Sequence, residues 1–240
     1  MKKRIWELDA LRGVCVIGMV VVHFVFDLVS LYGLVYWEYN ALFSFIMNWG
    51  GVLFLLISGV CATLGSHCVR RGLIVFGCGL IVTAVTAGMY LLGIAHPSII
   101  IYFGVLHCLG ICMMLWYFLK KLPTWALGIL GALLTVTGLL IRNLRVENPY
   151  LFWLGLTTET FSTADFFPLL PYLGFFLLGA VLGRTLYRSK TTLLPKISTA
   201  NPFIRFFTAC GRHSLIIYLL HQPALSLLII ILTKLVSRTD

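Results

Sequence analysis

The sequence predicts an all-α fold, a polytopic transmembrane helical bundle of about seven spans, and three observations lead to this class. Of the 240 residues, 60% are hydrophobic and only 11% are charged, whereas about 25% of the residues in soluble domains are charged. Apolar runs long enough for a helix to cross a bilayer, about 20 residues, follow one another along the chain. The basic residues gather in every second loop. These features exclude a soluble globular protein.

We expect one integral-membrane domain over residues 1–240. Turn residues or charges interrupt the apolar sequence at several points. The apolar runs between these interruptions cover residues 11–35, 41–65, 72–93, 99–119, 125–141, 168–187 and 214–236. The fifth run is the shortest. The first run is too long for the core of a signal peptide and contains His23 and Asp27, so we expect it to remain on the protein.

Each run has features of a helix in a compact bundle. The first begins as a charged approach and becomes apolar at Leu11, and the second carries small residues in NWGGVLFLLISG that allow close helix approach. The third has a mild polar face at Thr83 and Thr86, and the fourth opens with IYFGVLHCLG. The sixth follows a long outer loop, and the seventh contains Pro223, which should loosen its helix.

The basic residues set the orientation. With a cytoplasmic N-terminus, fourteen of the eighteen lie on the inner side, and those left outside are Arg142, Arg145, Lys234 and Arg238. The positive-inside rule therefore predicts the N-terminus in and the C-terminus out, in the inner (plasma) membrane. The same bias accounts for most of the net charge of +10, so the charge does not indicate a nucleic-acid partner.

The seven cysteines do not indicate a disulfide framework or a metal site. They are Cys15, Cys61, Cys68, Cys78, Cys108, Cys112 and Cys210, none of which lies in a predicted outer loop, and no C-x-x-C spacing occurs. Small buried apolar residues are the interpretation we prefer, and we expect no metal.

Two ionisable residues interrupt the first apolar run. Such residues in a membrane span are costly and usually face the interior of a bundle, where they serve a function. His23 and Asp27 are four residues apart, so they share a helix face, and the carboxylate is directed back over the imidazole. This spacing predicts a base and its orienting group.

Two further histidines fall within predicted spans. His107 lies about eight residues from the outer end of the fourth run, and His23 lies roughly 18 Å from the inner side, so the two share a level near the middle of the membrane. His221 lies about 10 Å from the inner end of the seventh run. Each could be a structural histidine or part of a site.

Two loops are longer than the others. The outer loop, residues 142–167, mixes charges with aromatic rings, and either binds a polar molecule or forms an interfacial lid. The inner loop, residues 184–212, is basic and contains a short amphipathic piece at 203–207. Anchoring at the membrane surface is favoured there over binding of an anionic cofactor.

Several segments resemble a known family. RIWELDALRG with a histidine and an aspartate downstream, FLLISG followed by RRGL, IYFGVLHCLG, LPYLGFFLLGAVLGR and SLIIYLLHQP are similar to the bacterial branch of the heparan-alpha-glucosaminide N-acetyltransferase catalytic-domain family, within the transmembrane acyltransferase superfamily. The resemblance implies transfer of an acetyl group from cytoplasmic acetyl-CoA to a sugar amine or hydroxyl of a glycan. Animal members carry their catalytic histidine just after the first family span, whereas no histidine occurs here between His23 and His67. Either His23 takes that role or the chemistry differs.

The residues suit acyl transfer, which needs a base, an oxyanion donor and aligned substrates. We assign His23 as general base, because an unperturbed pKa of about 6.5 suits that role, and Asp27 as its partner. His107 and His221 are candidates for oxyanion stabilisation or proton exit. Candidates for the coenzyme A phosphates or the inner entrance are four: Asp9, Arg12, Arg184 and Arg212. Asp9 and Arg12 could instead be an ion pair at the start of a helix. The expected partners are the bilayer, acetyl-CoA and a glycan acceptor, with a homodimer left open.

Two alternatives come from other functional classes. A proton-coupled transporter of small molecules also needs histidine and aspartate at the membrane midplane, and it would move substrate without consuming acetyl-CoA. A bis-histidine haem protein would use His107 with His23 or His221 as axial ligands. We rank the acyltransferase first and the haem protein last.

Overall fold

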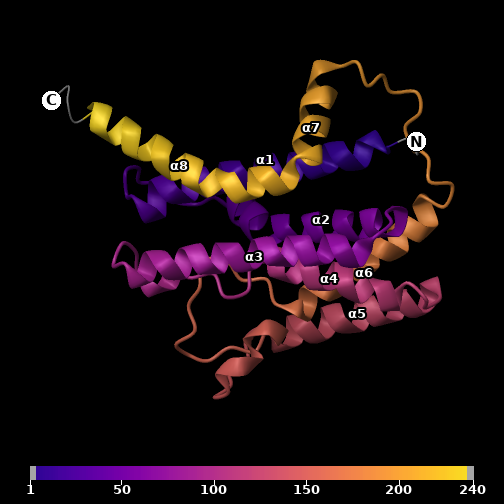
Figure 1. The fold of residues 1–240 in the computed structure, drawn as a ribbon, viewed down its shortest axis with the longest axis horizontal. Coiled ribbons are helices and arrows are strands. Elements are labelled where there is room, and N and C mark those ends of the chain that lie inside the picture. Colours follow the sequence, from indigo (N-terminus) through magenta and orange to yellow (C-terminus); the bar gives the residue numbers. More distant parts are fainter. Residues whose placement is uncertain (1–3, 237–240) are drawn as a thin grey trace. The chain divides into compact units, whose positions relative to one another are not determined.

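The structure is a computed structural model that describes residues 4–236, and these residues are mostly helical. This part of the chain forms eight α-helices, labelled in Figure 1: α1 (Trp6–Phe26), α2 (Ala41–Leu64), α3 (Cys68–Leu91), α4 (Val105–Leu119), α5 (Thr124–Ile141), α6 (Leu169–Leu186), α7 (Pro202–Arg212) and α8 (Ser214–Val236). A π-helical turn over Asp27–Leu31 continues α1, and short 3-10 helices cover Pro97–Ile99 and Pro149–Leu154.

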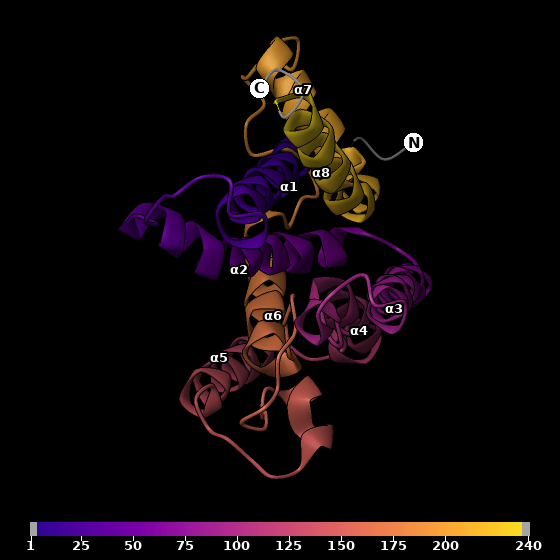
Figure 2. The same ribbon diagram turned by 90° about the vertical axis from the view of Figure 1, so that its left-hand side faces the viewer.

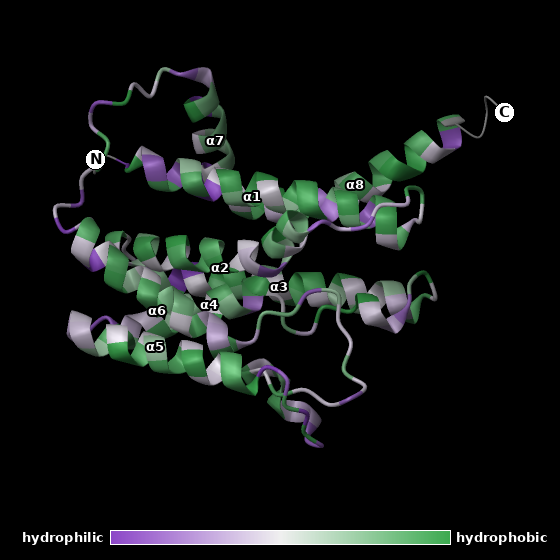
Figure 3. Cartoon of the chain, turned by 180° about the vertical axis from the view of Figure 1, so that it is seen from behind, coloured by the Kyte–Doolittle hydropathy of each residue, from purple (hydrophilic) through white to green (hydrophobic). Residues whose placement is uncertain are grey.

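The helices confirm the predicted polytopic membrane bundle. Among the described residues, six are long and apolar enough to cross a membrane: α1 with its π-helical turn, α2, α3, α5, α6 and α8. The helices consist mostly of hydrophobic residues, and many of the hydrophilic residues lie toward helix ends and loops (Figure 3). The chain is therefore a multi-pass membrane protein.

The fourth predicted span is wrong in its first part. α4 is a shorter apolar helix of 15 residues that begins at Val105, and residues 100–104 are not helical. α5, at 18 residues, is consequently not the shortest of the apolar helices that we predicted. Extended backbone of this kind occurs within membranes only where protein groups satisfy its hydrogen bonds.

Polar side chains hold the segment before α4. The Thr83 hydroxyl donates to the carbonyl of Ile101 at 2.6 Å, and the amide of Ile101 donates to Thr86 at 3.2 Å. The amide of Val105 donates to the Asp165 carboxylate at 3.1 Å, which places an acidic cap at the start of α4. Thr83 lies eight residues before the end of α3 at Leu91 (91 − 83 = 8), which is about 12 Å along the helix.

The chain divides into two compact units. Unit 1 contains the residues up to 54 and those from 194 onward, with α1, α7, α8 and the first half of α2. Unit 2 contains residues 55–193, with the second half of α2 and the helices α3 to α6.

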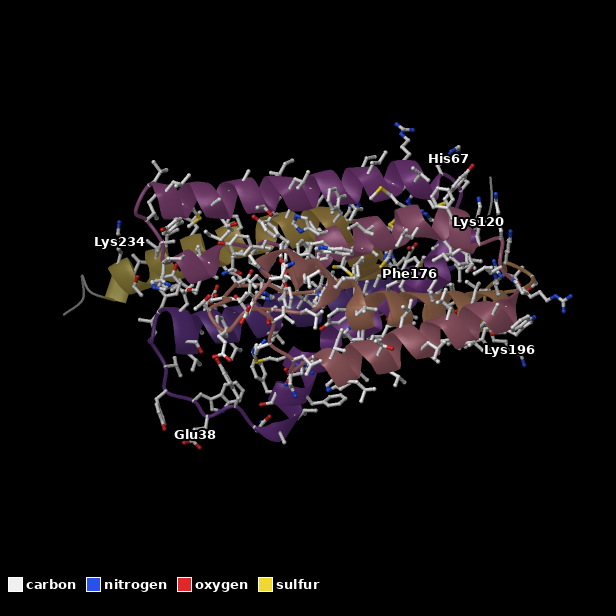
Figure 4. All side chains as sticks on the ribbon, turned by 90° about the horizontal axis from the view of Figure 1, so that it is seen from below. Glu38, His67, Lys120, Phe176, Lys196 and Lys234 are labelled. Carbon is white, nitrogen blue, oxygen red and sulfur yellow. The ribbon has the colours of Figure 1, made fainter. Side chains whose placement is uncertain are left out.

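In unit 2 the helices form a row in which α3 packs on α4, α4 on α6, and α6 on α5 (Figure 2). Fully buried side chains pack between these helices, among them Cys108, Cys112, Leu127, Phe176, Leu177 and Ala180. Figure 4 shows Phe176 among the helices of this unit, with His67 and Lys120 at one end. The indole of Trp116 joins α4 to α2 by donating to the carbonyl of Ala62 at 3.1 Å.

Glycines bring α2 and α6 into backbone contact within unit 2. A Cβ on Gly59 would overlap the carbonyl of Phe176, and a Cβ on Gly179 would overlap the carbonyl of Leu56. Lipid tails are as apolar as the side chains, so helices in a membrane associate through close packing of this kind.

In unit 1, α1 packs against α7 and α8. Glycines again allow close approach, because a Cβ on Gly13 would overlap the carbonyl of Phe207 and one on Gly211 would overlap the carbonyl of Asp9. α7 runs across α1, whereas α8 follows α1 in the same direction (Figures 1 and 2). Glu38 and Lys234 lie toward the end of this unit that is opposite to Lys196 (Figure 4).

We predict that Gly179→Val destabilises the protein, because its side chain would force α6 away from α2. The expected loss is about 1–3 kcal/mol, the usual cost of overpacking, and it should appear as a lower melting temperature in detergent by tryptophan fluorescence. Gly77→Val is the matched control, since no atom of the neighbouring elements lies within 4 Å of a Cβ on Gly77. Equal melting temperatures for the two variants would refute the close contact.

Candidate functional site

Four polar side chains meet between α1 and α8 in unit 1. His23 and Asp27 lie one turn apart on the same face of α1, at the point where the α-helix passes into a π-helical turn. His221 and Gln222 are neighbours on α8, directly before Pro223. π-helical turns are rare and often mark functional sites.

The Asp27 carboxylate is held by Gln222. The carboxamide Nε2 of Gln222 lies 3.0 Å from Oδ1 and 2.8 Å from Oδ2 of Asp27, whose side chain is only 1% exposed. A buried carboxylate is costly unless donors satisfy it. This amide is therefore what makes a carboxylate tolerable between the two helices.

His23 is oriented differently from our expectation. We expected Asp27 to orient the imidazole, but the Nδ1 of His23 lies 2.9 Å from the carbonyl of Met19. A helical side chain leans toward the helix N-terminus, so this ring reaches the carbonyl of the preceding turn. Asp27 then influences His23 through its charge, while its hydrogen bonds go to Gln222.

The hydrogen bonds of the two histidines determine their tautomers. A carbonyl only accepts, so Nδ1 carries the proton both in His23, toward Met19, and in His221, whose Nδ1 lies 2.6 Å from the carbonyl of Tyr218. In the neutral rings Nε2 therefore keeps its lone pair. The ring centroids of His23 and His221 are 4.9 Å apart, with the rings edge to face.

Two buried acceptors at this site lack a donor within the described residues. They are Nε2 of His221 and Oε1 of Gln222. Buried polar atoms are satisfied in the great majority of cases, so a pair of exceptions in one cluster needs an explanation. A ligand with N–H or O–H groups would supply the missing donors.

A second cluster lies near the N-terminal end of α1. Arg12 contacts Asp9 at 4.0 Å and donates to the hydroxyl of Ser214 at 3.0 Å, and Arg212 of α7 lies 3.6 Å from Asp9. The ion pair that we considered for Asp9 and Arg12 is thus present. Two guanidinium groups share the Asp9 carboxylate.

His107 belongs to unit 2, where both of its ring nitrogens have hydrogen-bond partners. Its Nδ1 accepts from the amide of Gly104 at 3.2 Å, and its Nε2 lies 3.3 Å from the Thr83 hydroxyl, whose proton goes to Ile101. The ring also stacks on Phe103 and is 3% exposed. His107 is the third residue of α4, since the helix begins later than we predicted.

Arg184 also lies in unit 2. Its guanidinium donates to the carbonyls of Lys120 and Leu122, beyond the end of α4, and stands over the ring of Trp116. Cations at a helix C-terminus stabilise it, so Arg184 closes the turn between α4 and α5.

Sequence reasoning missed Gln222. Glutamine is uncharged and stood in an apolar run beside a more conspicuous histidine. One signal could have identified Gln222. It is a polar residue within a predicted span, and its depth in the membrane could match that of Asp27. Within residues 4–236 the structure forms no group of three or more histidine, cysteine or acidic side chains suited to a metal ion.

Comparisons with known proteins give one match. A sequence model of the family described as heparan-alpha-glucosaminide N-acetyltransferase, catalytic, matches residues 4–223 and so includes all of the candidate residues above. No curated protein and no solved structure matches the chain.

We predict that Gln222→Leu destabilises the protein by about 1–3 kcal/mol, because it leaves the buried Asp27 carboxylate without a donor. Thermal unfolding in detergent measures the loss. The double variant Asp27→Leu with Gln222→Leu removes both partners, and it should be more stable than Gln222→Leu alone. If the two substitutions lower stability additively, the pair does not interact as described.

Proposed function

The chain belongs to the heparan-alpha-glucosaminide N-acetyltransferase catalytic family, a family of membrane acetyltransferases, and we propose that it moves an acetyl group from cytoplasmic acetyl-CoA to a sugar amine or hydroxyl of a glycan or glycoconjugate. One observation supports this most: His23 and His221 face each other with both Nδ1 protons committed to carbonyls. An imidazole with a free Nε2 lone pair is the group that a general base requires.

The proposed reaction is a direct transfer. The acceptor nitrogen or oxygen attacks the thioester carbonyl, forming a C–N or C–O bond as the C–S bond breaks. Nε2 of His23 takes the proton that the acceptor loses, and the coenzyme A thiolate is finally protonated. A positioned base of this kind contributes about 10²–10⁴-fold to a rate.

Asp27 and Gln222 support this base. The negative charge of Asp27, one turn from His23, stabilises the imidazolium that forms when Nε2 takes a proton. Gln222 is a positioning residue, because its amide fixes the carboxylate. His221 presents a second lone pair beside His23 and provides a route by which the proton leaves.

The donor substrate would approach from the inner end of α1. Arg12 and Arg212 are the cations of the cluster there, and guanidinium groups suit phosphates. With the N-terminus cytoplasmic, this end faces the compartment that holds acetyl-CoA, and the protein lies in the inner membrane. Arg184 and His107 have capping roles in unit 2, and the proposal gives them no part in the chemistry.

The haem alternative needed His107 as one axial ligand, together with His23 or His221. The hydrogen bonds of His107 do not favour it, because Nδ1 accepts from the amide of Gly104 and Nε2 contacts the Thr83 hydroxyl, so neither ring nitrogen is free for iron. A proton-coupled transporter would use the same polar residues as the acetyltransferase, and acetyl-CoA turnover distinguishes the two.

We predict that the purified protein binds acetyl-CoA saturably and releases coenzyme A when glucosamine is supplied as a probe acceptor. His23→Ala should lower this rate by about 10²-fold or more, since it removes the base, with acetyl-CoA binding retained. Calorimetry measures binding and chromatography measures coenzyme A. His96→Ala is the matched control, because His96 is exposed and bonds to Ser98 in a loop.

Failure of these measurements has separate meanings. No binding at millimolar acetyl-CoA by folded protein would overturn the acetyltransferase and leave the transporter as the working function. Turnover that survives His23→Ala unchanged would overturn the assignment of the base alone.

We predict that Asp27→Asn slows coenzyme A release about tenfold or more while the melting temperature stays level. Asparagine keeps the shape and one acceptor oxygen for Gln222, while the charge beside His23 is lost. Asp165→Asn is the control, since it removes a charge from the cap of α4 in unit 2 and keeps an acceptor for Val105. Equal rates for Asp27→Asn and the unaltered protein would eliminate the role of the carboxylate.

A further inference from the structure

α7 has one face committed to α1 and another that is open. Thr208 and Gly211 are buried and Phe207 is half-buried, and these residues follow helical spacing on the side that contacts α1. Phe203 and Phe206 are 74% and 53% exposed.

Basic groups accompany these aromatic rings. Arg205 and Arg212 are exposed on α7, and the segment before the helix exposes Leu194 and Ile197 on either side of the exposed Lys196. Exposed aromatic and aliphatic side chains interleaved with cations are typical of helices that lie at a lipid–water interface. A soluble protein partner would not require exposed apolar side chains and cations to alternate along the segment.

The direction of α7 and the point at which it crosses α1 agree with a position at the lipid–water interface. α7 runs across α1 and α8, which are candidate membrane spans of the same unit (Figures 1 and 2). It crosses α1 at Asp9 and Gly13, on either side of Leu11, where the apolar run of α1 begins. A helix that runs across a span at the start of its apolar part lies at the level of the membrane surface.

We infer that α7 is an in-plane helix that binds the headgroups of anionic phospholipids, with Phe203 and Phe206 inserted among the acyl chains and Arg205 on the phosphates. The partner is the lipid surface, since cations near an anionic leaflet and aromatic rings at its interface are both stabilised there. This inference is independent of the proposed reaction.

The lipid contact bears on the inner end of α1. Gly211 lies against the carbonyl of Asp9, and Arg212 lies 3.6 Å from the Asp9 carboxylate. A lipid surface that holds α7 therefore also holds the first turns of α1 and the cluster of Asp9 and Arg12. Anionic lipid then orders the side chains of Asp9 and Arg12 at the inner end of α1.

Hydrogen exchange tests this on the full chain in nanodiscs. Amides of α7 should exchange about fivefold more slowly in discs that contain phosphatidylglycerol than in discs of phosphatidylcholine alone, the factor expected for one arginine at an anionic surface. Residues 6–13 of α1 should follow the same trend. Mass spectrometry of peptides from the exchanged protein reports both segments.

Two variants complete the test. Arg205→Gln should remove most of the dependence on phosphatidylglycerol, whereas Arg142→Gln, which neutralises an exposed cation at the end of α5, should preserve it. Phe206→Ser should raise exchange of α7 in both lipids. Equal exchange of the unaltered protein in the two kinds of disc overturns the proposal, as does protection that depends on the number of protein copies per disc.

Discussion

The buried carboxylate of Asp27 is the constraint on which unit 1 depends. Isolated in an apolar medium, a carboxylate is so costly that it must be paired, hydrogen-bonded or neutralised, and here the Gln222 amide contacts both of its oxygens. Asp27 lies in the turn that continues α1, and Gln222 lies on α8. Their contact therefore fixes which residues of α8 lie beside which residues of α1. The register that results places His221 against His23. One polar contact thus assembles the candidate site.

Close packing supplies the second constraint. Helices in lipid gain little from burying apolar surface against each other, so they rely on backbone proximity and a few polar contacts. In each unit, glycines face carbonyl groups of the partner helix: Gly13 and Gly211 where α1 meets α7, and Gly59 and Gly179 where α2 meets α6. Where α1 meets α7, the contact of Arg212 with Asp9 joins the same two helices that Gly13 and Gly211 bring together.

Much of the fold could be predicted from the sequence, because hydropathy and charge act locally. The runs over 41–65, 125–141 and 214–236 agree with α2, α5 and α8 to within a residue. The start of α4 could not be predicted, since residues 100–104 continue the apolar run of the helix, and the side chains that hold this segment, Thr83, Thr86 and Asp165, lie 15 or more residues away in the sequence. The pair of Asp27 and Gln222 was also out of reach, because 195 residues separate them and nothing local marks them as partners.

The histidines show why the candidate site needed the structure. His23, His107 and His221 look alike in the sequence, each an ionisable residue in an apolar run. His107 uses Nδ1 to accept from the backbone before α4 and Nε2 to donate to Thr83, so both ring nitrogens serve the fold. In His23 and His221 only Nδ1 forms a hydrogen bond within the described part of the chain, and it donates to a backbone carbonyl of the same helix. A nitrogen that the fold does not use is available for chemistry, and the hydrogen-bond partners of the ring decide which histidines have one.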